Sequence, residues 1–205
     1  MAELILIRHG KTAGNLLGRY IGSRTDEPLC DEGREGLAGK KLPEVERLYV
    51  SPMKRCVETA EILWPGFDRK KMQKVTDLRE CDFGDFENKN YKELSGNGDY
   101  QAWIDSNGTL PFPNGESMDA FKSRCLEAFA RIVEDVSGAE QEWIASGKTG
   151  IFRAGIVVHG GTIMAILEQY GYPKAAYFDY QVKNGCGYRL TPVEGTRLWN
   201  CLCLQ

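Results

Sequence analysis

The sequence lacks long apolar runs and has no excess of basic residues. No run in its 205 residues approaches the roughly 20 apolar residues that a membrane-spanning helix needs, so we expect no membrane association. Lysine and arginine number 26 against 29 aspartate and glutamate residues, which leaves a net charge of -3. Proteins that bind nucleic acid normally present a net basic surface, so this balance argues against nucleic acid as a partner.

The segment from Met1 to Arg8 also lacks the features of a secretory signal. It has no basic region at its start, and its apolar stretch is too short for a signal peptide. We therefore expect a cytoplasmic protein.

Histidine is scarce, and cysteine shows no motif. The chain has only two histidines, and its seven cysteines include a single close pair, Cys201 and Cys203, whose spacing fits neither a zinc site nor a thioredoxin-type motif. A zinc cluster would have to draw on scattered cysteines. We therefore expect buried, unreactive thiols and no metal.

Apolar runs alternate with helical patterns along the chain. Continuous apolar runs predict strands at 4–7, 48–50 and 155–158, and two further runs predict closing strands at 187–190 and 198–204. Strands without alternation that are separated by helices indicate a mainly parallel sheet with helices on both faces, a three-layer α/β/α sandwich. Such sheets bind ligands beyond the carboxyl ends of their strands.

Helix start signals accompany several of these strands. Asp31 is a candidate cap for a short helix towards residue 41, and Ser51 and Pro52 predict the N-cap and first residue of a helix to about residue 64. A long helix is predicted from about Ser117, because apolar residues from 118 to 136 recur at spacings of three and four. Another helix is predicted through 163–167.

The chain has no repeat, charge block or low-complexity linker, so we expect residues 1–205 to form one domain. The segment at about 84–116 is irregular and rich in glycine, asparagine and aspartate, with aromatic residues between them. A long excursion of this kind is able to form one wall of a substrate pocket.

The two histidines, His9 and His159, occupy equivalent positions. Each directly follows an apolar strand, and each is followed by glycine. Because the carboxyl ends of parallel strands meet at one edge of the sheet, both side chains are candidates for a common site. One histidine at a strand end would more simply be structural.

Two arginines point to phosphate chemistry. Arg8 precedes His9, and its planar guanidinium suits phosphate oxygens, while the glycine after His9 lets a ligand approach the backbone. Arg55 lies in the first turn of a predicted helix. Taken alone, Arg55 is better explained as a solvated residue paired with Glu58 at i, i+3.

Four blocks of sequence resemble the histidine phosphatase superfamily, which has the phosphoglycerate mutase-like fold. They occur in that family's order and approximate spacing, at 6–15, 51–60, 78–84 and 158–161. Within the superfamily, 99–103 and 113–121 most resemble the branch of α-ribazole phosphatases of cobalamin biosynthesis. Lys11 and Val158 depart from the commonest family pattern, which bears on the branch more than on the chemistry.

The resemblance implies a role for each candidate residue. His9 would be the nucleophile that forms a phosphohistidine, and Glu80 the acid that protonates the leaving group. The phosphate-binding residues that it implies are Arg8, Asn15, Arg55, His159 and Gly160. The resemblance also implies that neither a metal nor a cofactor is needed. From the residues alone, Glu80 cannot be chosen over the neighbouring carboxylates Asp77, Asp82, Asp85 and Glu87.

Alternatives remain open at this point. The substrate would be a small phosphorylated metabolite, either α-ribazole 5′-phosphate or a substrate of a broad-specificity or sugar phosphatase. A phosphoglycerate mutase is disfavoured, because family mutases carry an arginine pair in a long insertion and residues 91–117 contain no arginine. A catalytically silent phosphate-binding protein is disfavoured because every implied residue is present. The oligomeric state cannot be predicted.

The aromatic residues of the loops also have two explanations. They could stack on a base-like part of a substrate, or they could pack the excursion onto the rest of the protein. The residues concerned are Tyr20, Phe86, Tyr91, Tyr100 and Trp103.

Overall fold

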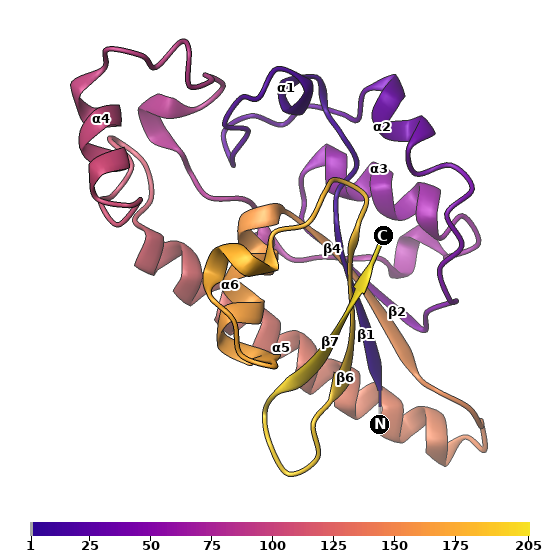
Figure 1. Cartoon of the computed structure of the whole chain (residues 1–205). Coiled ribbons are helices and arrows are strands. Elements are labelled where there is room, and N and C mark those ends of the chain that lie inside the picture. Colours follow the sequence, from indigo (N-terminus) through magenta and orange to yellow (C-terminus); the bar gives the residue numbers. More distant parts are fainter. Residues whose placement is uncertain (1) are drawn as a thin grey trace.

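A seven-stranded sheet forms the centre of the computed structural model, which describes residues 2–205 (Figure 1). Its strands lie in the order β3-β2-β4-β1-β6-β7-β5. They are β1 (Glu3–Arg8), β2 (Arg47–Val50), β3 (Gln73–Lys74), β4 (Arg153–Val158), β5 (Gly171–Tyr172), β6 (Gly187–Pro192) and β7 (Trp199–Leu204). All five predicted strands are confirmed, and the two that were not predicted, β3 and β5, are each only two residues long.

The sheet is mixed and mostly parallel, as expected. β1 pairs in parallel with β4, β4 with β2, and β2 with β3, whereas β6 is antiparallel to both β1 and β7. In the central pair, Arg8 lies opposite Val158. The residues that follow them, His9 and His159, therefore leave the sheet side by side.

Helices cover both faces of the sheet (Figure 1). They are α1 (Ala13–Leu16), α2 (Asp31–Glu35), α3 (Lys54–Leu63), α4 (Gly98–Asp105), α5 (Met118–Ala145) and α6 (Gly160–Tyr170), with 3-10 turns η1 (Arg69–Lys71), η2 (Thr76–Leu78), η3 (Gly84–Phe86) and η4 (Tyr177–Tyr180). None of the helices among the described residues combines the length and apolar character needed to cross a membrane.

The pleat of β1 divides the core into two layers. Leu4 and Leu6 belong to the cluster that includes α5 and α6, while Ile5 and Ile7 belong to the cluster that includes α3. Successive residues of a strand point to opposite faces, so a strand that is apolar throughout is buried on both sides. The predicted three-layer α/β/α sandwich is confirmed.

The predicted start of α5 is confirmed, whereas two other predicted caps are wrong. The Ser117 hydroxyl accepts a hydrogen bond from the Ala120 N–H at 3.2 Å and caps α5. α3 begins only at Lys54, because the buried Ser51 hydroxyl is bonded to His159 instead of capping a helix.

The helix predicted from Asp31 towards residue 41 is also shorter than expected. α2 ends at Glu35, and its cap is Cys30, whose sulfur accepts from the Gly33 N–H at 3.4 Å. Asp31 is the first helical residue, where its negative charge favours the helix N-terminus.

The excursion at 84–116 is more ordered than its composition suggests, since it contains η3 and α4. It forms the lobe at the upper left of Figure 1. Phe86 and Phe112 are buried in a third cluster together with Phe121 of α5. The excursion is therefore packed against α5 through its aromatic residues.

Candidate active site

The two histidines meet at the carboxyl ends of β1 and β4. Their ring centroids are 5.2 Å apart, and the rings are inclined at 65°. His9 is 3% exposed and His159 is fully buried. The sheet thus brings together two residues that lie 150 positions apart in the chain, as the pattern predicted.

The His9 ring is held in one orientation. Its Nδ1 lies 2.7 Å from the carbonyl oxygen of Gly10, which can only accept, so Nδ1 carries the proton. The lone pair is therefore on Nε2. Burial, together with the positive charges of Arg55 and Arg8, holds the pKa of His9 well below its usual range. Near neutral pH this imidazole is uncharged and able to act as a nucleophile.

His159 is neutral for similar reasons. Burial lowers its pKa, and so do the nearby Arg55 and His9. Its Nδ1 accepts from the Nε of Arg55 at 3.3 Å, and its Nε2 lies 2.7 Å from the Ser51 hydroxyl. With Nδ1 accepting, the proton is on Nε2 and is donated to Ser51.

Arg8 has a donor that no protein group satisfies. Its Nη1 donates to the carbonyl of Val182 at 2.7 Å, but its buried Nε has no hydrogen-bond partner within residues 2–205. An unsatisfied buried donor is costly unless a ligand or water meets it. The position beside His9 therefore suits an anionic oxygen.

Arg55 is fully buried rather than solvated. It donates from Nη1 to the carbonyl of Thr25 at 2.8 Å and from Nη2 to that of Gly22 at 3.0 Å. The alternative pairing with Glu58 is wrong, because Glu58 is bonded to Arg34 at 2.7 Å. Arg55 thus anchors the segment at 22–25 and places a positive charge beside both histidines.

Asn15 lies near the same edge, with its side-chain oxygen already occupied. That oxygen accepts from the Thr12 N–H and from Nδ2 of Asn184, both at 3.2 Å. Asn184 also donates to the carbonyl of His9 at 3.1 Å. The amide nitrogen of Asn15 is therefore the group left to meet an anion. The backbone of Gly160 opens the first turn of α6, where N–H groups lack helical acceptors.

Glu80 is the buried member of the candidate carboxylates, at 8% exposure. Its Oε1 accepts from the Cys81 N–H at 3.0 Å and its Oε2 from the Gly161 N–H at 3.2 Å. Burial raises its pKa, although these two bonds and the charges of Arg55 and Arg8 oppose the rise. A raised pKa favours a carboxyl group that still carries its proton near neutral pH.

The other four carboxylates have partners of their own. Asp77 pairs with Arg131, Asp82 with Arg24, Asp85 with Asn114 and Glu87 with the Gly22 N–H, at distances of 2.7 to 2.9 Å. Burial therefore distinguishes Glu80 from these four carboxylates, which the sequence alone did not.

Two residues that contact the histidines, Ser51 and Asn184, were not predicted from the sequence. Ser51 was assigned to a helix cap instead. For Asn184 the only available signal was the turn predicted by the Asn184-Gly185 pair, which says nothing about its contact with His9. Among residues 2–205, no group of three or more histidine, cysteine, aspartate or glutamate side chains is placed to hold a metal ion.

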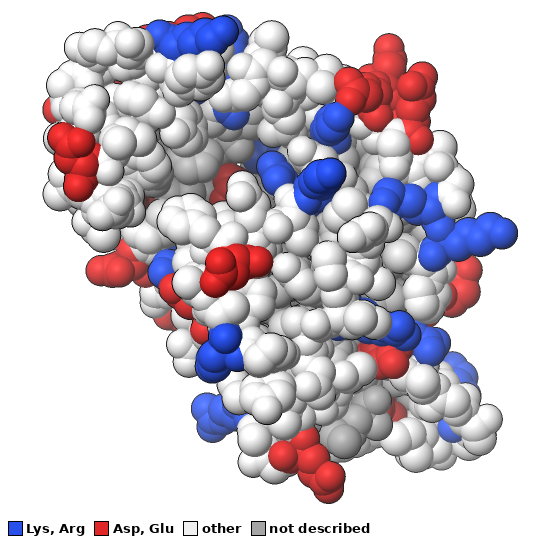
Figure 2. Space-filling view, in the orientation of Figure 1, with Lys and Arg blue, Asp and Glu red and all other residues white. Residues whose placement is uncertain are grey.

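The surface above the strand ends is hollowed beside the lobe that carries α4 (Figure 2). Lysine and arginine side chains border this hollow, so anions are favoured there (Figure 2). Two neutral imidazoles, two guanidinium groups and a helix N-terminus converge at the carboxyl ends of β1 and β4. This arrangement can bind a phosphoryl group and attack it from His9.

Comparisons with known proteins agree with this arrangement. The model of the histidine phosphatase superfamily, branch 1, matches residues 4–203. Phosphoglycerate mutase-like protein 4 of Arabidopsis thaliana is 30% identical over 176 residues, which cover 82% of this chain and 70% of that protein. An adenosylcobalamin/alpha-ribazole phosphatase of Salmonella typhimurium is 28% identical over 203 residues, which cover 94% of this chain and 92% of that protein.

A solved structure shows the same fold. The alpha-ribazole phosphatase from Shigella flexneri superimposes with a TM-score of 0.75 at 24% identity, over 98% of this chain and 95% of that one. Enzymes of the matched superfamily act on small phosphorylated substrates. The chain, in its fold and along nearly its whole length, belongs to the histidine phosphatase superfamily, branch 1.

Proposed function

We propose that this chain is a single-domain, metal-independent phosphomonoesterase that works through a phosphohistidine. The observation that carries the proposal is the state of His9, a neutral ring whose Nδ1–H is held by Gly10 and whose Nε2 lone pair is free. Its neighbours supply fixed positive charge. Most of the catalysis of phosphoryl transfer comes from such positioning and electrostatic stabilisation.

The reaction has two steps. In the first, Nε2 of His9 forms a bond to phosphorus while the bond from phosphorus to the ester oxygen breaks, and Glu80 gives its proton to the departing oxygen. In the second, water attacks phosphorus, Glu80 takes the proton of that water, and the bond from nitrogen to phosphorus breaks. Dividing the reaction in this way replaces one difficult step with two easier ones.

The phosphoryl oxygens would be held by Arg8, Arg55, His159, Asn15 and the Gly160 N–H. The unpartnered Nε of Arg8 supports this assignment most directly, since it needs an acceptor. To donate to phosphate, the Nδ1 of His159 would have to take up a proton. Rotation of the Ser51 hydroxyl permits this, because a hydroxyl can either donate to Nε2 or accept from it.

Hydrolysis is favoured over phosphoglycerate mutation by the composition of the pocket wall. Residues 91–117 carry no arginine, so the excursion offers no arginine pair to hold a second acidic group of the substrate. A mutase needs to bind that second acidic group while the phosphohistidine transfers its phosphoryl group back to the substrate. A silent binding protein is the weaker candidate, because the nucleophile, both arginines and the acid are all at the site.

We propose α-ribazole 5′-phosphate as the substrate, and hence a role in cobalamin biosynthesis. The similarity to the Salmonella typhimurium relative over almost the whole of both chains supports it. The aromatic residues add no support, because Tyr20, Phe86, Tyr100 and Trp103 contact one another. A broad-specificity or sugar phosphatase of the superfamily is the alternative.

The first experiment measures phosphate release in excess EDTA by the wild-type protein and by His9→Ala. The panel holds α-ribazole 5′-phosphate, 3-phosphoglycerate, fructose 2,6-bisphosphate and nitrophenyl phosphate. We expect preference for the ribazole ester, no release by His9→Ala, and an acid-labile phosphoenzyme only in the wild type. Slow turnover of every ester would agree with the proposed phosphatase activity but contradict the cobalamin role. No release by folded wild-type protein would contradict the phosphatase itself.

A further inference from the structure

We propose that Arg124, on α5, is a positioning residue for Glu80, which it controls by fixing the backbone on both sides of that residue. The inference rests on the proposed function, in which Glu80 is the proton donor. Arg124 would act only through Glu80 and would not touch the substrate.

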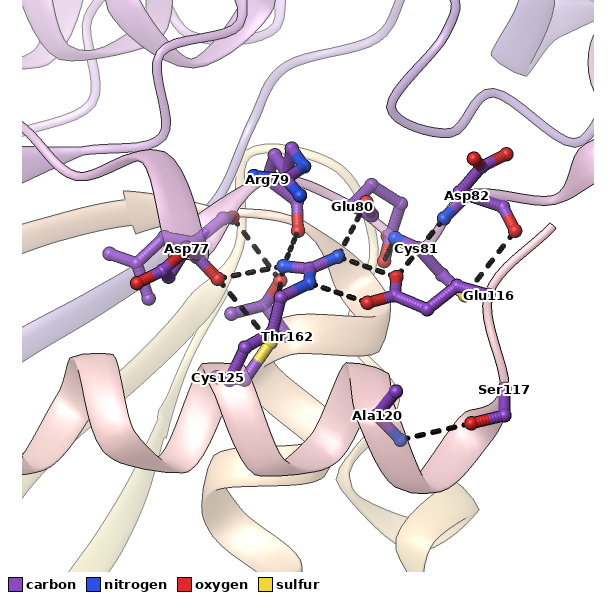
Figure 3. Close-up of polar contacts among 12 residues, drawn as sticks. Asp77, Arg79, Glu80, Cys81, Asp82, Glu116, Ser117, Ala120, Cys125 and Thr162 are labelled. Carbon is purple, nitrogen blue, oxygen red and sulfur yellow. Dashed lines mark hydrogen bonds and ion pairs between the residues drawn. The ribbon is translucent and has the colours of Figure 1, made fainter.

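The guanidinium group of Arg124 uses all five of its N–H donors. Nη1 donates to the carbonyl oxygens of Asp77 and Arg79, both at 2.7 Å, and Nη2 donates to the carbonyl oxygen of Glu80 at 3.0 Å. Glu116 accepts the other two bonds, from Nε at 2.7 Å and from Nη2 at 2.8 Å. Figure 3 shows the labelled acceptors grouped around this one guanidinium group.

The segment that carries Glu80 needs this support, because it has no regular structure of its own. Residues 79–83, all of them described, belong to no helix or strand between η2 and η3. The carboxyl group of Glu80 is held at its tip by the N–H groups of Cys81 and Gly161. A shift of the backbone at residue 80 would pull the carboxyl group away from α6 and from the phosphate pocket.

Glu116 completes the support on the other side. Besides pairing with Arg124, its Oε2 accepts from the Asp82 N–H at 3.3 Å, and its own N–H donates to the carbonyl of Asp82 at 2.9 Å. The ion pair is largely buried, with 13% of the arginine side chain and 17% of the glutamate side chain exposed. Buried ion pairs contribute little net stability, so a positioning role explains this one better than a stabilising role.

The charge of Arg124 is paired with Glu116 and contributes to the lowered pKa of His159, but it is not among the charges that set the pKa of Glu80. The charges that bear on the carboxyl group of Glu80 are those of Arg8 and Arg55. The negative charge of Glu80 in turn raises the pKa values of Cys56, Cys81, Cys125 and Tyr177. Loss of Arg124 should therefore affect Glu80 mainly by moving it.

The same helix offers a matched control. Arg131 also bonds to the segment, but its Nη2 meets the Asp77 side chain at 2.7 Å, and its own side chain is 56% exposed. It holds no backbone carbonyl. Arg131→Met therefore removes a charge and an ion pair from α5 without freeing the backbone at Glu80.

The test compares glycerol phosphate, whose alkoxide leaves only with a proton, with nitrophenyl phosphate, whose phenolate leaves unaided. We expect Arg124→Met to lower kcat/KM on glycerol phosphate about 100-fold and on nitrophenyl phosphate by less than about threefold. The comparison uses kcat/KM because it reports only the steps up to departure of the leaving group, whereas hydrolysis of the phosphohistidine is common to both esters. Arg131→Met should leave both rates near wild type. In a Glu80→Gln background, Arg124→Met should change neither rate by more than about threefold, because the glutamine that Arg124 then positions has no acidic proton to donate.

Equal slowing of both esters by Arg124→Met, or a large effect that persists in Glu80→Gln, would overturn the inference. If Arg124→Met does not fold, Arg124→Lys serves instead, since it keeps a charge beside Glu116 but lacks the planar set of five donors. It should show the same selectivity. If Glu80→Gln itself lowers kcat/KM equally for both esters, the assignment of the acid fails, and this inference fails with it. If Glu80→Gln is selective and Arg124→Met is not, only this inference fails.

Discussion

The two ring nitrogens of His9 have different environments, and this difference decides what the residue can do. Gly10 fixes the proton on Nδ1, while burial and two arginines keep the ring from taking a second proton. Glu80 is affected in the opposite way, since burial raises its pKa and so favours the protonated carboxyl. One desolvated pocket thus lowers the pKa of His9 and raises that of Glu80, and both shifts favour the uncharged form.

These opposite shifts predict the pH dependence of the reaction. For an alkyl phosphate we expect kcat/KM to fall as the pH rises through the pKa of Glu80, which lies above its ordinary value of 4.5, because the donor then loses its proton. Loss of activity through protonation of His9 should appear only well below pH 6.5.

The measurement is a pH profile of kcat/KM for wild type and Glu80→Gln on the same substrate. Using one substrate cancels the second ionisation of the phosphate itself, near pH 6. The fall on the basic side should be absent in Glu80→Gln. Identical profiles for the two proteins would contradict the role of Glu80.

At the scale of the element, the first turn of α6 contains a glycine, Gly161, that lies against the carboxyl group of Glu80. A Cβ on Gly161 would lie 2.5 Å from Oε1 of Glu80 and 3.1 Å from the ring of Phe121. Alanine is the better helix former by roughly 1 kcal/mol, so the absence of a side chain there serves the carboxyl group. Gly138, inside α5, has no atom within 4 Å of the corresponding position.

These two glycines predict opposite outcomes for one kind of substitution. Gly138→Ala should raise the free energy of unfolding by about 0.5–1 kcal/mol and leave turnover unchanged. Gly161→Ala should displace Glu80 and lower turnover of glycerol phosphate by about tenfold or more, with little loss of stability. Urea unfolding and steady-state rates on both variants provide the comparison. Unchanged turnover in Gly161→Ala would show that the carboxyl group does not depend on this contact.

At the scale of the whole molecule, the lobe formed by 84–116 depends on its aromatic residues for attachment. Phe86 is fully buried, and its ring lies 5.3 Å from that of Tyr100 and 5.9 Å from that of Phe112. These rings pack in edge-to-face geometry, which is favourable for aromatic pairs. Of the two explanations for the loop aromatics, the contacts support packing for this group, whereas Tyr91 is 64% exposed.

Removal of the central ring should therefore loosen the lobe. We expect Phe86→Ala to lower the free energy of unfolding by about 3–5 kcal/mol, because it leaves a cavity in a packed cluster. Tyr91→Ala, in the same lobe, should change it by no more than about 0.5 kcal/mol. Urea denaturation of both variants makes the comparison. Equal, small losses would mean that the lobe is held by other contacts.

The sequence by itself determined the main strands of the sheet and the meeting of the two histidines at its edge. Runs of apolar residues without alternation predicted β1, β2 and β4, and the placement of His9 and His159 directly after two of them predicted that they would meet. The positions of the strands can be predicted from local pattern, because burial on both faces produces a continuous apolar run and the strand ends where that run ends. The caps show the limit of such signals, since Ser117 caps α5 while Ser51 does not cap α3.

Only the tertiary structure decided which polar groups act together. Contacts between distant residues decide whether Arg55 is solvated or buried. They also decide which of the five carboxylates is buried, and what fixes the segment at 79–83 that carries Glu80. Glu80 meets the N–H of Gly161, and Arg124 reaches the carbonyls of the Glu80 segment from α5. A polar side chain satisfies whichever donor or acceptor the fold brings near it. Its partner is therefore set by the packing of helices on the sheet and not by its neighbours in sequence.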